Sequence, residues 1–315
     1  MYNANLHSIL FAGHPLDDTD RWAAMIYVYG DISGKPDDPM MAAACYLGRE
    51  PTLQVANARW QAILAEFGPG AEFHATDFFA GWGLGKGLTN TQRIDIGQRF
   101  AAIPADEGLV GFSFVVDNLS FGQRLAPVIA EEKRRYSSED LRVFCSMRCL
   151  GLVAQFLHEA YDSNPPAEMK QSIQIILEEE HGFGRYQNFF GESQARTEQW
   201  TWWFSGITPG KKKVLPLQMA DLLAHQSAYR VADLTKNPKA PHRPVFGRLV
   251  QGDHVRLDWL NEANAAESAE FYRLILRSHA DGLVADRREL ERLRVLARLT
   301  AWGRFKRWLR DWLSH

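Results

Sequence analysis

The stretch that most constrains this chain is residues 211–225, where a short extended run gives way to a helix that is apolar almost all round. Pro216 suits the first helical turn, where its missing N–H has no partner to lose. Leucine, methionine and alanine fill most of the following positions, which is typical of a helix buried in the protein. The chain therefore requires other elements that cover this helix.

Three polar residues, Gln218, Asp221 and His225, share one stripe of this helix because they are spaced at i, i+3 and i+7. An ionised carboxylate in the interior requires a bonded cation or a metal ion as its partner. Asp221 is therefore a candidate metal ligand. The alternative is a carboxylate that accepts hydrogen bonds from backbone or arginine donors.

Asp31 follows a predicted strand. Residues 23–29 are apolar, β-branched and aromatic, which predicts a buried strand that stops at the glycine before Asp31. Turn-forming residues at 35–39 precede a second apolar run, residues 40–47, so the two runs are expected to form a hairpin. Asp31 is thus either a site residue at a strand end or a cap of the turn.

A later strand also ends in acids. Residues 172–177 predict a strand, and Glu178, Glu179 and Glu180 follow it directly. Several carboxylates that converge from distant elements suit phosphoryl transfer assisted by two divalent metal ions. Mg²⁺ and Mn²⁺ are the expected ions because carboxylate oxygens are hard ligands. Glycoside hydrolysis would instead need a pair of acids.

His74 and Asp77 lie three residues apart, just before the glycine-rich residues 80–87. This loop lacks the lysine-serine or lysine-threonine pair of a phosphate-binding loop. The two residues are candidate site residues. The alternatives are a hydrogen-bonded histidine at the end of a short edge-like run, residues 72–75, and an aspartate that caps a helix.

Apolar periodicity predicts the remaining elements. Helices are expected at 53–67, 91–103, 119–132 and 137–161, and further strands at 109–117 and 200–207. Prolines from Pro238 to Pro244 indicate a loop, after which the chain is expected to close with helices. From Asp281 onward, apolar and arginine residues alternate at helical spacing. This basic amphipathic helix could pack on its own domain, join a second subunit, or contact lipid or nucleic acid; we favour packing or an oligomer.

Composition narrows the class of protein. The chain has 315 residues, 46% hydrophobic side chains and a formal net charge of -2, so contact with nucleic acid would need local basic patches. Three cysteines form no CxxC pair, which favours a reducing, cytoplasmic environment. No apolar run approaches the roughly 20 residues that span a bilayer, so we expect no transmembrane segment.

Three motifs resemble a bacterial and phage family, the domains of unknown function numbered 3800. Gly30-Asp31-Ile32-Ser33-Gly34 looks like the family's Asp-Glu-Ser-Gly opening. Phe73-His74-Ala75-Thr76-Asp77-Phe78 resembles its histidine-containing motif, and residues 216–224 resemble its closing Gln-x-x-Asp helix. The resemblance covers residues 22–232, after an irregular lead-in at 1–21, and leaves a loop and helical extension at 233–315.

The family is regarded as ribonuclease H-like, so the resemblance implies an α/β fold with a mixed sheet flanked by helices. It also implies a metal-dependent nuclease site in which Asp31, one of Glu178, Glu179 and Glu180, and Asp221 hold the ions while His74 lines the site. Two departures are Ile32, where the family usually has glutamate, and a central glutamate where such sites more often carry aspartate.

Two functional classes follow. The first is a nuclease acting on DNA or RNA, with Lys133-Arg134-Arg135, Lys211-Lys212-Lys213 and the C-terminal helix gripping phosphates. The second is a catalytically inactive ribonuclease H-like binding module, such as a subunit of a phage-defence or mobile-element system, with the C-terminal helix as its contact to protein partners or a second copy.

Overall fold

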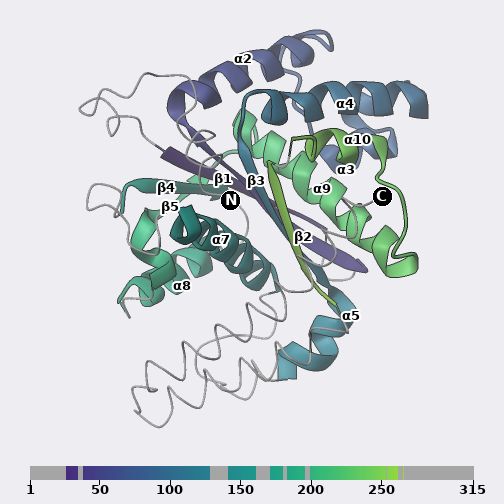
Figure 1. The fold of residues 1–315 in the computed structure, drawn as a ribbon. Coiled ribbons are helices and arrows are strands. Elements are labelled where there is room, and N and C mark those ends of the chain that lie inside the picture. Colours follow the sequence, from purple (N-terminus) through teal and green to yellow (C-terminus); the bar gives the residue numbers. More distant parts are fainter. Residues whose placement is uncertain are drawn as a thin grey trace. The chain divides into compact units, whose positions relative to one another are not determined.

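The computed structural model describes residues 26–34, 38–127, 141–160, 171–179, 183–195, 199–252, 254–261 and 265 (Figure 1). The chain divides into two compact units, one formed by residues 1–118 and 140–260 and the other by residues 119–139 and 261–315. Several predictions lie outside the described residues, namely the lead-in at 1–21, the basic run Lys133-Arg134-Arg135, Glu180 and the helix after Asp281.

The first unit is built on a six-stranded sheet with the order β5-β4-β1-β2-β3-β6. Its strands are β1 Ile26–Ser33, β2 Met40–Arg49, β3 Val110–Asp117, β4 Ile173–Glu178, β5 Phe204–Gly210 and β6 Val255–Leu260. Strand β2 runs antiparallel to both of its neighbours, and the other adjacent pairs are parallel. The predicted hairpin of the first two strands and the mixed sheet of an α/β fold are both confirmed.

Helices flank both faces of this sheet (Figure 1). The helices of this unit are α2 Glu50–Ala65, α3 Ala75–Ala80, α4 Asn90–Asp106, α7 Leu141–Ala160, α8 Phe183–Ala195, α9 Leu215–Lys236 and α10 Pro244–Leu249, with the 3-10 turns η1 Gly83–Gly85 and η4 Gln199–Trp203. Helix α9 packs on β1, β2 and β3, and α2, α3, α4 and α10 surround it, while α7 packs on the other face of β2 and β3.

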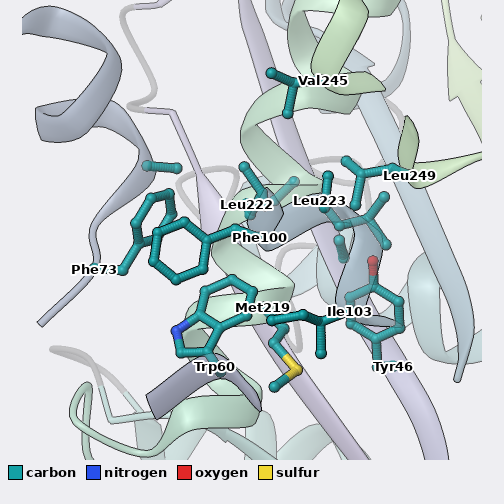
Figure 2. Close-up of a cluster of buried hydrophobic side chains, with 14 of the residues drawn as sticks. Tyr46, Trp60, Phe73, Phe100, Ile103, Met219, Leu222, Leu223, Val245 and Leu249 are labelled. Atoms are coloured by element: carbon teal, nitrogen blue, oxygen red, sulfur yellow. The ribbon is translucent and has the colours of Figure 1, made fainter. Parts of the chain in front are cut away.

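Helix α9 is the buried helix that the sequence predicts. Its residues from Pro216 to Ser227 are all buried. Figure 2 shows part of the buried cluster around it, which includes Met219 of α9, Trp60 of α2 and Phe100 of α4. The Trp60 ring meets Phe100 at 4.4 Å between centroids and Phe73 edge-on at 5.6 Å. These aromatic contacts join α2, α4 and the segment before α3 on the α9 side of the sheet.

Four elements differ from their predicted form. Strand β1 continues through Asp31 to Ser33 because the hairpin pairing with β2 extends to Ser33, so Asp31 lies inside the strand. Residues 71–74 form no strand, and residues 199–203 form a 3-10 turn before β5. The proline-rich loop ends at Pro244, which occupies the first turn of α10, a position that proline favours.

Strand β6 was not predicted, because the chain was expected to close with helices. It pairs in parallel with β3 at the edge of the sheet. The compact unit that contains the sheet therefore includes β6 and reaches Leu260. The alternation Val-Arg-Leu-Asp-Trp-Leu in β6 has the period of a strand and is the signal that could have identified it.

The second unit is described at residues 119–127, 261 and 265. Its described part is helical: α5 Asn118–Ser120, which begins at the last residue of the first unit, leads into the π-helical turn η2 Phe121–Leu125. The predicted helix at 119–132 therefore begins where expected. Among the residues that the structure describes, no helix combines the length and the hydropathy needed to cross a membrane.

Candidate functional site

Asp31, inside β1, and Glu178, the last residue of β4, lie side by side on neighbouring parallel strands. The register of β1 and β4 pairs Gly30 with Leu177, so the next residue of each strand falls on the same face, the one covered by α9. Asp31 is only 7% exposed, and Glu178 is half-buried. Glu179 is exposed, and strand alternation directs it to the opposite face, so Glu178 is the described acid of the triplet that reaches Asp31.

Helix α9 brings Asp221 to the same place. Asp221 is 4% exposed, and its Oδ2 accepts a hydrogen bond of 2.7 Å from the backbone N–H of Ala75, a first-turn donor of α3 that no helical carbonyl satisfies. The charge of Asp221 acts on Asp31, and that of Glu178 acts on both aspartates. Asp31, Glu178 and Asp221 thus form one group, which we call the acidic cluster.

Burial and mutual repulsion shift the pKa values of this cluster. Burial raises the pKa of Asp31 well above its ordinary value, and the charge of Asp221 and a hydrogen bond with Glu178 raise it further. Burial also raises the pKa of Asp221, although the charge of His74, the Ala75 N–H and Lys212 oppose that rise. The cluster therefore holds more negative charge than its surroundings neutralise, and it would favour a proton or a cation.

His74 and Asp77 lie at the start of α3, next to the acidic cluster. The Nδ1 atom of His74 is 3.1 Å from Oδ2 of Asp77. His74 occupies the N-cap position of α3, and Asp77 is the third helical residue, so Asp77 is not the cap that the alternative reading expected. His74 also lies near enough for its charge to act on Asp221. The predicted pair is thus present and adjoins Asp221.

Gln218 and His225 share the stripe of Asp221 but have other partners. The Oε1 atom of Gln218 accepts hydrogen bonds of 3.1 Å from Nε1 of Trp60 and from the backbone N–H of Phe73. Gln218 therefore fixes the segment that leads to His74. The ring of His225 stacks on Phe79 at 5.2 Å, and its burial, aided by the charges of His74 and Arg243, lowers its pKa to about 4. His225 is neutral at pH 7 and is no cationic partner for Asp221.

Lys211, Lys212 and Lys213 lie between β5 and α9, and all three are exposed. Their position follows from the chain path, because the loop that connects β5 to α9 must pass the carboxyl end of β4, where Glu178 lies. The positive charge of Lys212 lowers the pKa of Asp221, so this basic run adjoins the acidic cluster. The hydrogen bond from the Ala75 N–H to Asp221 could not be predicted from the sequence. Every residue except proline has a backbone N–H, so the type of residue at position 75 does not indicate this donor.

The carboxylates do not form a closed metal cage. Within the part of the chain that the structure describes, no three or more His, Cys, Asp or Glu side chains are grouped closely enough to hold one ion together.

In comparisons with known proteins, no family model, no curated protein and no solved structure matches this chain.

Replacing Asp31 with asparagine is expected to stabilise the protein at neutral pH when divalent cations are absent. Because the pKa of Asp31 is raised, the folded state keeps a proton that the unfolded state releases above the ordinary pKa of 3.8. Stability therefore falls as pH rises above about 4, and the amide avoids that loss. We expect a gain of about 1–3 kcal/mol over the parent at pH 7 and little difference near about pH 3.5.

Urea unfolding of both proteins across this pH range, in the presence of a chelator, measures the difference. Glu179→Gln is the matched control, because its exposed carboxylate should leave stability almost unchanged at every pH. An Asp31→Asn protein that is less stable than the parent at pH 7 would show that the Asp31 charge is satisfied in the folded state.

Proposed function

We propose that the chain is a divalent-metal-dependent nuclease of the ribonuclease H-like kind, which hydrolyses phosphodiester bonds of DNA or RNA. The observation that carries the proposal is the convergence of Asp31, Glu178 and Asp221 from β1, β4 and α9. The mixed sheet with helices on both faces agrees with the architecture that the resemblance to the family of domains numbered 3800 implies.

The donor chemistry of the acidic cluster fits Mg²⁺ or Mn²⁺. Hard carboxylate oxygens are the preferred ligands of these ions. Burial raises the pKa of Asp31, and the nearby charges of Asp221 and Glu178 raise it further, so a cation would relieve the repulsion within the cluster. Mg²⁺ commonly keeps several waters and uses one or two protein carboxylates together with substrate phosphates, so it does not need a closed cage of three side chains. When bound, such an ion polarises phosphoryl oxygens and lowers the pKa of bound water.

The residues around the cluster have roles consistent with this reaction. The exposed ammonium groups of Lys211, Lys212 and Lys213 would bind phosphates of the substrate strand and steer it to the acids. His74, paired with Asp77, can hold or transfer a proton at the rim of the cluster, and the Ala75 N–H keeps the Asp221 carboxylate in one orientation.

The departure at Ile32 changes no member of the acidic cluster. Ile32 follows Asp31 in β1, so its side chain lies on the opposite face of the sheet from that of Asp31. It lines a small cavity together with Ser146 and Cys149 of α7, and Asp31 and Glu178 border the same cavity. A glutamate at this position would point away from Asp221. The loss of that glutamate therefore removes no member of the group formed by Asp31, Glu178 and Asp221.

The second candidate is a catalytically inactive binding module of the same fold. It is favoured by the hydrogen bond between the carboxyl groups of Asp31 and Glu178, since a proton shared there neutralises part of the charge without a cation. In this alternative the cluster is structural, and the protein acts by binding nucleic acid or a protein partner.

The two candidates are distinguished by incubating the full chain with labelled single-stranded and duplex DNA and RNA, with Mg²⁺, Mn²⁺ or a chelator. We expect cleavage with Mg²⁺ or Mn²⁺ and none with the chelator. Thermal melting supplies an independent measurement, because a bound cation should raise the Tm of the parent but not that of Asp221→Asn. Absence of both cleavage and a cation-dependent rise in Tm would favour the inactive module.

A further inference from the structure

An exposed tryptophan lies on the loop that follows α3. Trp82 is 66% exposed, although its ring is among the largest apolar side chains. Its backbone is held on both sides: its N–H donates to the carbonyl of Asp77 and its carbonyl accepts from Gly85, each at 2.8 Å. The flanking Gly81 and Gly83 have φ angles of 86° and 51°, which favour glycine.

The loop cannot easily move to bury this ring. A Cβ atom added to Gly85 would lie 2.1 Å from the carbonyl oxygen of Phe78, so the loop packs directly on the backbone of α3. Arg93 of α4 secures the far end of the loop with a hydrogen bond of 2.9 Å from Nη1 to the carbonyl of Leu88. The indole of Trp82 is therefore held towards solvent on a fixed backbone, which is the arrangement of a rigid contact residue.

Trp82 is one short helix away from the acidic cluster. Helix α3 begins at Ala75, whose N–H bonds Asp221, and ends at Ala80. Its six residues span roughly 9 Å at the helical rise of about 1.5 Å per residue. Successive nucleotides of one strand are about 3.4 Å apart when stacked, so this length corresponds to about three nucleotides. The exposed Lys212 places positive charge beside the same cluster.

We propose that Trp82 stacks against an unpaired base of a single-stranded nucleic acid whose phosphodiester bond lies at the acidic cluster. This inference rests on the proposed nuclease function and names its substrate class. An indole offers a stacking surface to any base, whereas the bases of a duplex already stack on one another and expose no face. Charge complementarity supports a nucleic acid as the ligand. Its phosphates would contact the exposed lysines of residues 211–213 while one base stacks on the Trp82 ring.

The test compares Trp82→Ala, Trp82→Phe and a matched control, Val55→Ala, which removes an exposed apolar side chain from α2. Fluorescence anisotropy with labelled single-stranded and duplex oligonucleotides gives the Kd values, with Ca²⁺ in the buffer and equal Tm values as a check of folding. We expect Trp82→Ala to weaken single-strand binding by about 10-fold or more. Trp82→Phe should keep most of the affinity, and Val55→Ala should match the parent.

The outcomes separate the two proposals. If Trp82→Ala binds single strands as tightly as the parent, or loses duplex binding equally, the stacking role is wrong. The nuclease function still stands in that case, provided that the parent cleaves with Mn²⁺ and Asp221→Asn does not. If the parent binds neither kind of strand, both proposals fail. A parent dimer that becomes a monomer on Trp82→Ala would assign the ring to a protein interface and overturn the inference.

Discussion

Replacing either Asp31 or Asp221 with asparagine is expected to reduce metal-dependent phosphodiester cleavage by about 1000-fold, equivalent to the several kcal/mol that a bound cation contributes. The asparagine oxygen can still accept the hydrogen bond from Ala75 that Asp221 now accepts, so the shape of the site is retained. The charge that a divalent ion requires is lost. Titration calorimetry with Mn²⁺ should accordingly show lost affinity in both variants.

The double variant gives a sharper result than either single one. Because both residues would hold the same ion, the second substitution has nothing further to remove, and the double variant should be no less active than the single variants. Glu179→Gln is the matched control because it is adjacent to Glu178 but lies exposed. Multiplicative losses, or an unchanged Mn²⁺ affinity in Asp221→Asn, would mean that Asp31 and Asp221 do not share an ion.

The elements with strong periodicity could be predicted from the sequence. Helix α9 was predictable because its apolar residues occupy nearly every face, a pattern that only a buried helix tolerates. The pairing of β1 with β2 was predictable because two apolar runs flank a short stretch of turn-forming residues. Weak patterns were missed: β6 alternates charged and apolar residues over only six positions, and its partner β3 is distant in sequence.

The sequence indicated which acidic residues are candidates for the site, but not which of them lie close together in the fold. Asp31 and the glutamate triplet could be identified because each follows an apolar run, whereas the choice of Glu178 requires the register between β1 and β4. That register is set by tertiary pairing and leaves no local trace. The role of Gln218 was also hidden, because its two partners are the Trp60 indole and the Phe73 backbone, more than a hundred residues away.

Gln218→Leu is expected to lower the free energy of unfolding by about 2–6 kcal/mol, because two buried donors lose their acceptor at about 1–3 kcal/mol each. The Nε1–H of Trp60 and the backbone N–H of Phe73 both donate to Oε1 of Gln218. Leucine has no side-chain oxygen that could accept either hydrogen bond. Urea unfolding measures the loss.

A double-mutant cycle with Trp60→Phe assigns the two parts of this loss. In the Trp60→Phe background one donor is already absent, so Gln218→Leu should cost only the share of the Phe73 N–H. Additive costs would show that the hydrogen bond from the Trp60 indole contributes nothing.

The same variants also test whether Gln218 is a ligand of the metal ion. Its oxygen is occupied by the two donors, so once the protein is folded Gln218→Leu should keep the Mn²⁺ affinity of the parent. A folded Gln218→Leu protein without that affinity would place Gln218 among the ligands of the ion.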